Sequence, residues 1–355
     1  MDKRWHELAH ILVTYSTQVR PGERVMIAMG EAETLPLVRA VYEAAVRAGA
    51  HVQVQFLSEY LKHSLLRHGK PEQVAWIPEI EAYGMEWADV YFGLRGAHNL
   101  YELADIPAEV LAAHQRALGQ ISTLRWQKTR WCLVRVPNEA LAQQAQTDVE
   151  TLTDTCFAAC LRDWPSEAAR WQRIAAELEK GSEVRLTGWE TDLRFSVRGR
   201  RWVVGDGRMN MPDGEILTAP VVESLDGHIA FEFPGVLGGR LVPGIRLEWR
   251  EGRLIRAEAR ENADFLRQVL ATDAGASLIG EFAIGVNDGL DRFCYDILLD
   301  EKIGGTVHIA LGRAYPETGG SNPSACHWDM VKDTRREGAI YLDGRMVFRD
   351  GRFTI

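Results

Sequence analysis

The sequence predicts two domains: an α/β domain with a mainly parallel sheet at residues 1–178, and a β-rich α+β domain at residues 179–355. Three observations support this fold class. The chain has 355 residues, more than the roughly 100–200 residues usual for one domain. Its first half alternates buried strand segments with amphipathic helical segments, which is typical of a parallel sheet. Its second half carries short alternating segments and hairpin turns instead.

The first domain opens with a βαβ unit. Residues 24–29 (RVMIAM) form an apolar run of strand length, and residues 51–57 (HVQVQFL) form a second strand segment. Between them, residues 35–49 place apolar side chains at helical spacing and end near a glycine. Two strands joined by a helix in this way pair in parallel.

The later elements follow the same logic. Further strands are predicted at 88–96 and 130–138, and a helical stretch at roughly 139–180. In the second domain, EVRLTG, DLRFSVRG and HIAFEFPG are short alternating segments. A hairpin with an EG turn is predicted at 244–259, and a helix at 262–279 interrupts the strands. The chain ends in another predicted hairpin, AIYLDGRMVFRDGRF.

Composition narrows the function classes. The net charge of −9 argues against a general nucleic-acid binder, which would be basic. No apolar run approaches the roughly 20 residues that span a bilayer, and the N-terminus lacks the pattern of a signal peptide. The five cysteines form no CxxC pair, which suits a reducing compartment. We therefore expect a cytoplasmic protein without nucleic-acid or membrane partners.

The candidate metal ligands of interest lie in the second half of the chain. His327 and Asp329 stand two apart in SACHWDM, so they share one face of a strand while Trp328 and Cys326 point the other way. His308 lies on the less apolar face of a strand, between small residues. Each residue alone is more often structural or exposed than a ligand. The candidate ligands are Glu215, Glu281, His308, Tyr315, His327 and Asp329.

Taken together, these six residues form a mixed nitrogen and oxygen donor set, which we expect the second domain to carry. Three carboxylates and a bridging hydroxide would balance the charge of two divalent ions. Such donors suit zinc, cobalt or manganese. Two ions at about 3.5–4 Å are the arrangement of hydrolytic two-metal sites.

Four segments resemble the aminopeptidase T/aminopeptidase S family of metalloaminopeptidases. MPDGEILTAP, IGEFAIGVN, DEKIGGTVHIALGRAYPETGG and SACHWDM occur in the family's order across roughly 205–350, and LVRVPNEALAQQA is more weakly similar. The loop between Tyr315 and His327 is shorter than in some members. The resemblance implies two divalent ions per chain, a homodimer, and a large active-site cavity between the domains. It implies as ligands Glu215, Glu281, His308, Tyr315, His327 and Asp329.

The resemblance also implies a reaction: hydrolysis of the N-terminal peptide bond of short peptides, with broad preference for the first residue. In such a reaction a hydroxide held by both ions attacks the carbonyl, and one ion binds the free α-amine. A general base must take and return a proton. Glu317 is the candidate, with an exposed loop carboxylate as the alternative interpretation. Lys302 could polarise an oxyanion, although a surface salt bridge is its more usual role.

Two other function classes stay open. His308, His327 and Asp329 form a two-histidine, one-carboxylate set, the usual arrangement of non-haem iron(II) oxygenases. A mononuclear, ring-cleaving dioxygenase of the dihydroxypyridine type is therefore the alternative, but it would leave Glu215 and Glu281 without a role. A binding or scaffold protein with an inactive site is the third possibility, and the complete ligand set argues against it.

Overall fold

The computed structural model describes residues 2–355, apart from the side chain of Ala108, and the chain divides into two compact units. The first unit consists of the chain up to Arg162 and the segment Gly207–Pro212. The second consists of Asp163–Asp206 and Asp213–Ile355. Helix α9 (Trp164–Leu178) belongs to the second unit, whereas the sequence analysis divided the domains at residue 178.

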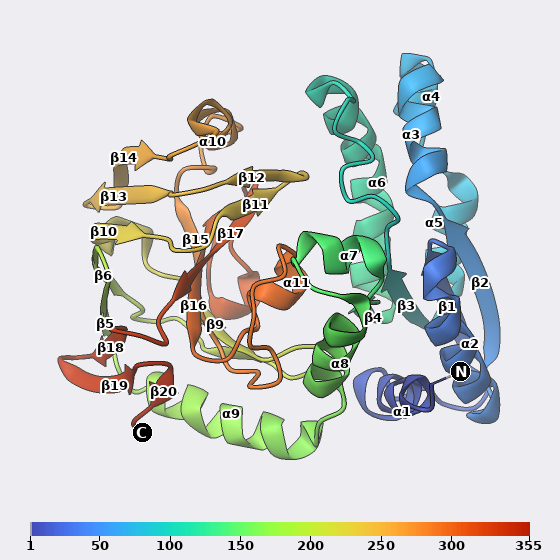
Figure 1. The fold of residues 1–355 in the computed structure, drawn as a ribbon, viewed down its shortest axis with the longest axis horizontal. Coiled ribbons are helices and arrows are strands. Elements are labelled where there is room, and N and C mark those ends of the chain that lie inside the picture. Colours follow the sequence, from blue (N-terminus) through green and yellow to red (C-terminus); the bar gives the residue numbers. More distant parts are fainter. Residues whose placement is uncertain (1) are drawn as a thin grey trace. The chain divides into compact units, whose positions relative to one another are not determined.

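The first unit is built on a five-stranded sheet in the order β2-β1-β3-β4-β8 (Figure 1). Every pairing in it is parallel, which confirms the fold class predicted for this half of the chain. The strands are β1 (Arg24–Gly30), β2 (His51–Leu57), β3 (Val90–Arg95), β4 (Arg130–Arg135) and β8 (Asn210–Met211). The short strand β8 comes from a segment that the sequence analysis did not assign to this sheet.

Helices cover this sheet because its central strands are apolar on both faces. One core cluster joins β1, β3 and β4 to α5 and α6 through Ala28, Met85, Tyr91, Ile121 and Leu133. The sequence analysis predicted α2 but did not name α3, α5 or α6. The α-helices of the unit are α1 (Arg4–Ile11), α2 (Leu35–Arg47), α3 (Glu59–His68), α4 (Pro71–Val74), α5 (Glu79–Trp87), α6 (Ala108–Lys128), α7 (Glu139–Gln144) and α8 (Val149–Cys160). A π-helix spans Leu12–Ser16 and a 3-10 turn spans Ala32–Thr34.

The predicted helical stretch at 139–180 is three helices, α7, α8 and α9. Side-chain caps explain the breaks, because the side chains of Asn138, Asp148 and Asp163 each accept a hydrogen bond from a backbone N–H of the helix that follows. Residues of this type favour helix starts over helix interiors.

The second unit contains two larger antiparallel sheets and a small hairpin (Figure 1). The eight-stranded sheet runs β14 (Arg253–Glu258), β13 (Arg246–Arg250), β10 (Asp226–Ala230), β6 (Thr191–Ser196), β5 (Glu183–Gly188), β18 (Ala339–Leu342), β19 (Arg345–Arg349) and β20 (Arg352–Phe353). The five-stranded sheet runs β17 (His327–Asp333), β16 (Thr306–Gly312), β15 (Ile279–Gly285), β9 (Glu215–Thr218) and β7 (Val203–Gly205). The hairpin pairs β11 (Gly235–Leu237) with β12 (Arg240–Val242).

Both hairpins predicted in this half are present, as β13–β14 and β18–β19. The apolar faces of the two larger sheets meet in the core of the unit, where the rings of Phe195 and Phe282 lie 4.9 Å apart. Trp202 packs edge-on against the same Phe282 ring. This packing fixes which face of the five-stranded sheet is left for chemistry.

Helix α10 (Ala263–Leu270) is shorter than the helix predicted at 262–279. Asp273 ends the helical region, because its carboxylate accepts hydrogen bonds from the N–H groups of Gly275 and Ala325 and from the Ser324 hydroxyl. The remaining helical turns of the unit are α11 (Ile297–Asp300) and the 3-10 turns Val222–Ser224 and η4 (Pro316–Thr318).

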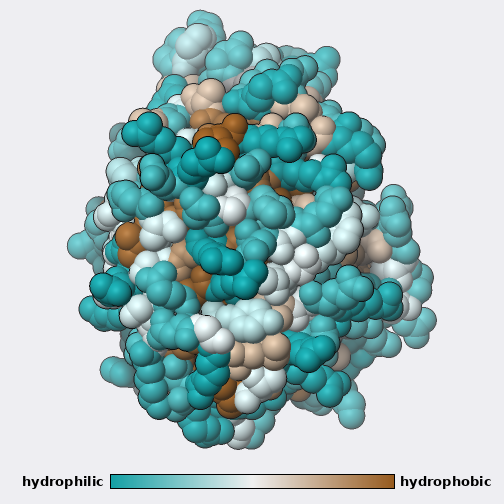
Figure 2. All heavy atoms as spheres, turned by 90° about the vertical axis from the view of Figure 1, so that its left-hand side faces the viewer, coloured by the Kyte–Doolittle hydropathy of each residue, from teal (hydrophilic) through white to brown (hydrophobic). Residues whose placement is uncertain are grey.

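The surface of the second unit that faces the viewer in Figure 2 is mainly hydrophilic, with scattered apolar side chains. No helix among the described residues is long and apolar enough to cross a membrane.

Candidate metal centre

One face of the five-stranded sheet carries the candidate ligands. The register places Glu281 opposite Ala310, and Ala310 opposite Asp329. It places His308 opposite Ala283 and His327 opposite Gly312. Directly opposed residues of antiparallel strands share a face, as do residues two apart in one strand. Four predicted ligands therefore point to the same side, and small residues lie between them.

Glu215 extends this row from β9, where it is opposite Gly285 in β15 and Gly205 in β7. A Cβ atom at Gly205 would lie 2.4 Å from Asp213 Oδ1 and 3.0 Å from Glu215 Cγ, so no side chain fits there. The opposite face of the sheet is apolar and enters the core. Trp328, 1% exposed, is on that face, as predicted from its place between two ligand candidates.

The first donor cluster joins Glu281, His327 and Asp329, whose donor atoms lie within 4.8 Å of one another. His327 Nε2 is 3.4 Å from Asp329 Oδ1 and 3.6 Å from Glu281 Oε2. The Nδ1 atom of His327 lies 2.8 Å from the carbonyl oxygen of Arg313, which orients the ring. Tyr315 adds a phenol oxygen 3.5 Å from His327 Nε2.

A second donor cluster joins Glu215, Glu301 and His308 within the same limit of 4.8 Å. His308 Nε2 is 3.3 Å from Glu215 Oε2 and also 3.3 Å from Glu281 Oε1. Glu281 therefore contacts both clusters, with Oε1 toward His308 and Oε2 toward His327. A carboxylate in that position can hold two ions side by side.

Glu301 is a cluster residue that the sequence analysis missed. It follows α11 and is largely buried, with a side chain 13% exposed. Its neighbour Lys302 is fully buried, so the interpretation of Lys302 as a surface salt bridge is wrong. Both residues lie in the DEKIGG segment that carried part of the family resemblance. Their place in that segment was the one signal in the sequence that pointed to the site. Acidic and basic neighbours in a sequence are otherwise usually exposed.

Glu317, the predicted general base, is exposed in η4 and belongs to neither donor cluster among the described residues. Hydrogen bonds from Arg200 and Arg201 hold the loop that carries it. The backbone N–H of Arg201 donates to the Thr318 carbonyl, and the Arg200 guanidinium donates to that of Gly319.

Buried atoms without hydrogen bonds test whether the residues suit a metal. Glu281 Oε2 and Asp329 Oδ1 are buried and accept no hydrogen bond from any described residue. His308 Nδ1 is also buried and makes no hydrogen bond to any described residue. Buried carboxylate oxygens without partners are costly and rare. Divalent ions would satisfy the two oxygens, and the mixture of imidazole nitrogen and carboxylate oxygen suits zinc, cobalt or manganese.

The charges in the site depend on one another. Burial raises the pKa of Glu215, but the Lys302 ammonium and the His308 ring outweigh it and hold that pKa at about 2. Burial raises the pKa of Glu301 to about 8, against the attraction of Lys302. Burial lowers the pKa of His327, but the charges of Asp329 and Glu281 raise it to about 10. The carboxylates thus favour positive charge at this face of the sheet.

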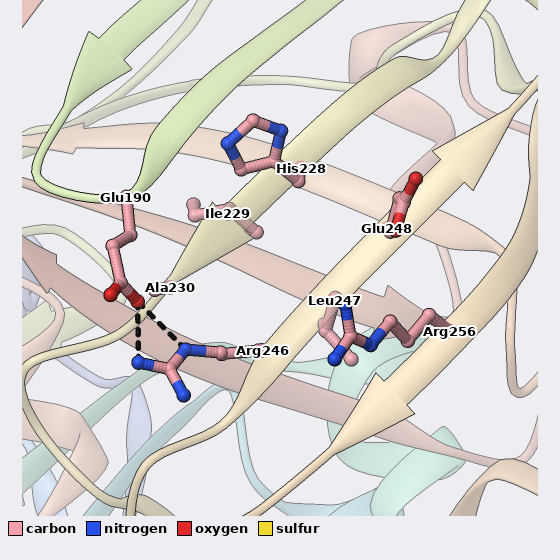
Figure 3. Close-up of a pocket in the computed structure, with 8 residues that line it drawn as sticks. All are labelled: Glu190, His228, Ile229, Ala230, Arg246, Leu247, Glu248 and Arg256. Carbon is pink, nitrogen blue, oxygen red and sulfur yellow. Dashed lines mark hydrogen bonds and ion pairs between the residues drawn. The ribbon is translucent and has the colours of Figure 1, made fainter.

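A hollow of about 510 Å³ lies elsewhere in the second unit, over strands β10, β13 and β14 (Figure 3). Its lining residues are Glu190, His228, Ile229, Ala230, Arg246, Leu247, Glu248 and Arg256. Arg246 donates to Glu190 across it at 2.7 Å, and His228 is exposed. None of the candidate metal ligands lines this hollow, and its paired charges resemble an ordinary solvated sheet surface.

Known proteins resemble this chain in sequence and in fold. Aminopeptidase 2 of Geobacillus stearothermophilus is 24% identical over 99% of this chain and 97% of its own. Aminopeptidase T of Thermus thermophilus is 25% identical over 98% of each chain. The solved structure of wild-type AmpT from Thermus thermophilus has the same fold, with a TM-score of 0.88, 24% identity and 99% of both chains covered.

A second solved structure shares the fold less closely. The 2,5-dihydroxypyridine dioxygenase from Pseudomonas putida KT2440 superimposes with a TM-score of 0.59 at 15% identity, over 99% of this chain and 96% of its own. The family model described as thermophilic metalloprotease (M29) matches residues 1–353. With two neighbouring donor clusters and a family match along nearly its whole length, the chain belongs to the M29 family of metalloproteases.

Proposed function

We propose that this chain removes the N-terminal residue from short peptides, with broad preference for that residue, as a metalloaminopeptidase that uses two divalent ions. The observation that carries the proposal is the position of Glu281 between the two donor clusters. A carboxylate that faces both clusters can serve two ions that lie side by side. The relatives named aminopeptidase support the exopeptidase assignment.

Each ion has its own set of residues in this proposal. Glu215 and His308 would hold one ion, and His327, Asp329 and Tyr315 the other, with Glu281 serving both and Glu301 beside the first ion. Bound there, two divalent ions would activate a water between them and polarise the scissile carbonyl. The residues supply the negative charge that keeps both cations close together. The identity of the metal, zinc, cobalt or manganese, is left to measurement.

Proton transfer needs a group that can take a proton and return it. Glu317 is the candidate from the sequence, and Glu301 is the candidate from the geometry. Glu301 is the stronger one, because it is buried beside Glu215 and His308, where it can reach a group bound between the ions. Glu317 is exposed and outside both clusters.

The function is tested by metal analysis and a substrate panel on one preparation. We expect two divalent ions per chain and release of the chromogenic group from leucyl or arginyl amides with added cobalt, manganese or zinc. The same amides with an acetylated amine should not react, because the free α-amine is needed. A folded, metal-loaded protein that turns over none of the free amides would contradict the proposal.

A second candidate function is a mononuclear iron dioxygenase, in which His308, His327 and Asp329 would hold the ion. It is favoured by one observation, that these three residues share a sheet face. It gives no role to Glu215 and Glu301, which form a donor cluster with His308. One iron per chain and oxygen uptake with a dihydroxypyridine would support this candidate over the peptidase.

We also propose a homodimer, as the family resemblance implies. In the first unit β2 pairs only with β1 among the described strands, so its other edge is open. On β2, Val54 and Phe56 are 41% and 52% exposed, more than apolar strand residues usually are. Light scattering should give twice the chain mass for the parent protein and a smaller mass for Phe56→Glu. A monomeric parent protein would refute the dimer. The cytoplasmic location stays a prediction.

A further inference from the structure

Lys302 is a buried cation beside the candidate metal centre, and its ammonium group cannot bind a metal ion. Its side chain is 0% exposed. Its Nζ atom lies 2.6 Å from Glu215 Oε1, 2.6 Å from Glu301 Oε1 and 3.6 Å from Asp213 Oδ1. Burying an ammonium group is costly unless carboxylates surround it, so the site is built around this contact.

The contact divides the oxygens of Glu215 between two tasks. Oε1 faces the ammonium, and Oε2 lies 3.3 Å from His308 Nε2 in the donor cluster. Glu301 also gives Oε1 to the ammonium. Glu215 is thus left with one oxygen for an ion. A carboxylate free to turn could offer both oxygens to the same ion instead.

The contact also lowers the net negative charge of the centre. The sequence analysis counted three carboxylates against two divalent ions, and the structure adds a fourth, Glu301. Lys302 adds one positive charge beside it. Asp213 brings a fifth carboxylate to the same ammonium, so Lys302 offsets part of the negative charge beside the ions.

We propose that Lys302 is a positioning residue of the metal centre, which restricts Glu215 to one oxygen toward the ions and offsets part of the charge of the carboxylates around it. The proposal rests on the proposed two-metal function. It concerns ligation rather than turnover, so it can fail while the peptidase assignment stands. Likewise, a lack of peptide hydrolysis would not contradict the role of Lys302 in ligation.

The same unit offers a matched control. Lys332 is also 0% exposed, and its Nζ atom lies 2.9 Å from Glu232 Oε1, 2.9 Å from the Ala230 carbonyl and 3.1 Å from that of Trp189. Lys332 stands three residues after Asp329, so its side chain is on the core face of β17, away from the ligands. Replacing it removes a buried ammonium without changing the donor clusters.

The test uses cobalt(II), which absorbs visible light according to the number and geometry of its ligands, whereas zinc does not. The full chain, freed of metal and titrated with cobalt, is compared with Lys302→Met and Lys332→Met. We expect both variants to bind two cobalt ions per chain. Lys302→Met should lose visible absorption per bound ion, because the freed Glu215 Oε1 raises the coordination number. Lys332→Met should keep the parent spectrum.

Three results would overturn the proposal: an unchanged spectrum in Lys302→Met, an equal change in Lys332→Met, or no cobalt binding by the parent chain. If Lys302→Met does not fold, the double variant Glu301→Gln/Lys302→Met keeps the net charge and still frees Glu215 Oε1. It should fold and show the same loss of absorption. If it too fails to fold, Lys302 serves the fold rather than ligation. Peptide hydrolysis by the parent chain is measured separately and decides the proposed function alone.

Discussion

At the scale of single residues, the centre depends most on Glu281. Its two oxygens face different histidines, and both lie in a buried sheet face. We expect Glu281→Ala to lose both ions, because each cluster loses a donor. Asp329→Ala should affect mainly one ion, because Asp329 lies beside His327 in the first cluster. Elemental analysis after dialysis measures the metal content.

Glu317→Ala is the control for those variants, since Glu317 is an exposed carboxylate in the same unit. It should retain two ions per chain. A Glu281→Ala protein that also retains two ions would refute the shared position of this carboxylate.

The two candidates for proton transfer predict different kinetics. Glu301→Gln keeps the shape and loses the basic oxygen, so kcat should fall by about 10²–10⁴-fold with intact folding. Glu317→Gln should change kcat by only a few-fold. The opposite ranking, measured on a leucyl amide at saturating cobalt, would return the role to Glu317.

The histidines predict a proton release on metal binding. Burial lowers the pKa of His308, but Glu215 and Glu281 raise it well above its ordinary value, and the pKa of His327 is about 10. The raised pKa favours the protonated ring at both positions in the metal-free chain, and ligation needs the rings neutral. Cobalt affinity should rise with pH. Titration calorimetry in buffers of different ionisation enthalpy should give different observed enthalpies; equal values would contradict this prediction.

At the scale of elements, the segment between Tyr315 and His327 is held by hydrogen bonds rather than by its own secondary structure. Asn322 Nδ2 donates to the carbonyls of Gly275 and Gly312. Asp273 accepts from Ala325 N–H and from the Ser324 hydroxyl. These bonds join the segment to the chain after α10 and thereby fix the start of β17, where His327 stands.

Asp273 makes this attachment dependent on pH. The hydrogen bonds from Ala325 and Ser324 lower the pKa of its carboxyl in the folded state. Its contribution to stability is therefore present above the unfolded pKa and is lost as the pH falls through the lower folded pKa. Asp273→Asn should unfold at lower urea than the parent chain at pH 7, and the difference should vanish in strong acid. A difference independent of pH would refute this.

At the scale of the whole molecule, metal binding should stabilise the folded chain, because the two donor clusters exist only when β9, β15, β16 and β17 are assembled. An ion at a hundred times its Kd stabilises by about 2.7 kcal/mol per site. Thermal unfolding should therefore shift upward with cobalt concentration and back with a chelator. Glu281→Ala should remove most of the shift; an equal shift in that variant would indicate binding elsewhere.

The sequence by itself determined the fold class and most of the site's composition. Alternation of strands and helices indicated the parallel sheet, and spacing of two placed His327 and Asp329 on one face with Trp328 on the other. These are local properties, set by the period of a strand and by the exclusion of apolar residues from water. The length predicted for the helix at 262–279 was wrong, because Asp273 accepts a hydrogen bond from Ser324, which lies 51 residues further along the chain.

Only the tertiary structure decided which charged residues are buried. Glu301, Lys302 and Glu317 are all polar residues near turns, and nothing local separates them. The antiparallel register brings Glu215, Glu281 and His308 together, and the folding of α11 places Glu301 and Lys302 beside them. Burial of a charge depends on the partners that surround it, and these partners come from strands distant in sequence. For that reason the local pattern could suggest ligands, while the lysine that restrains them and the carboxylate it pairs with emerged from the fold.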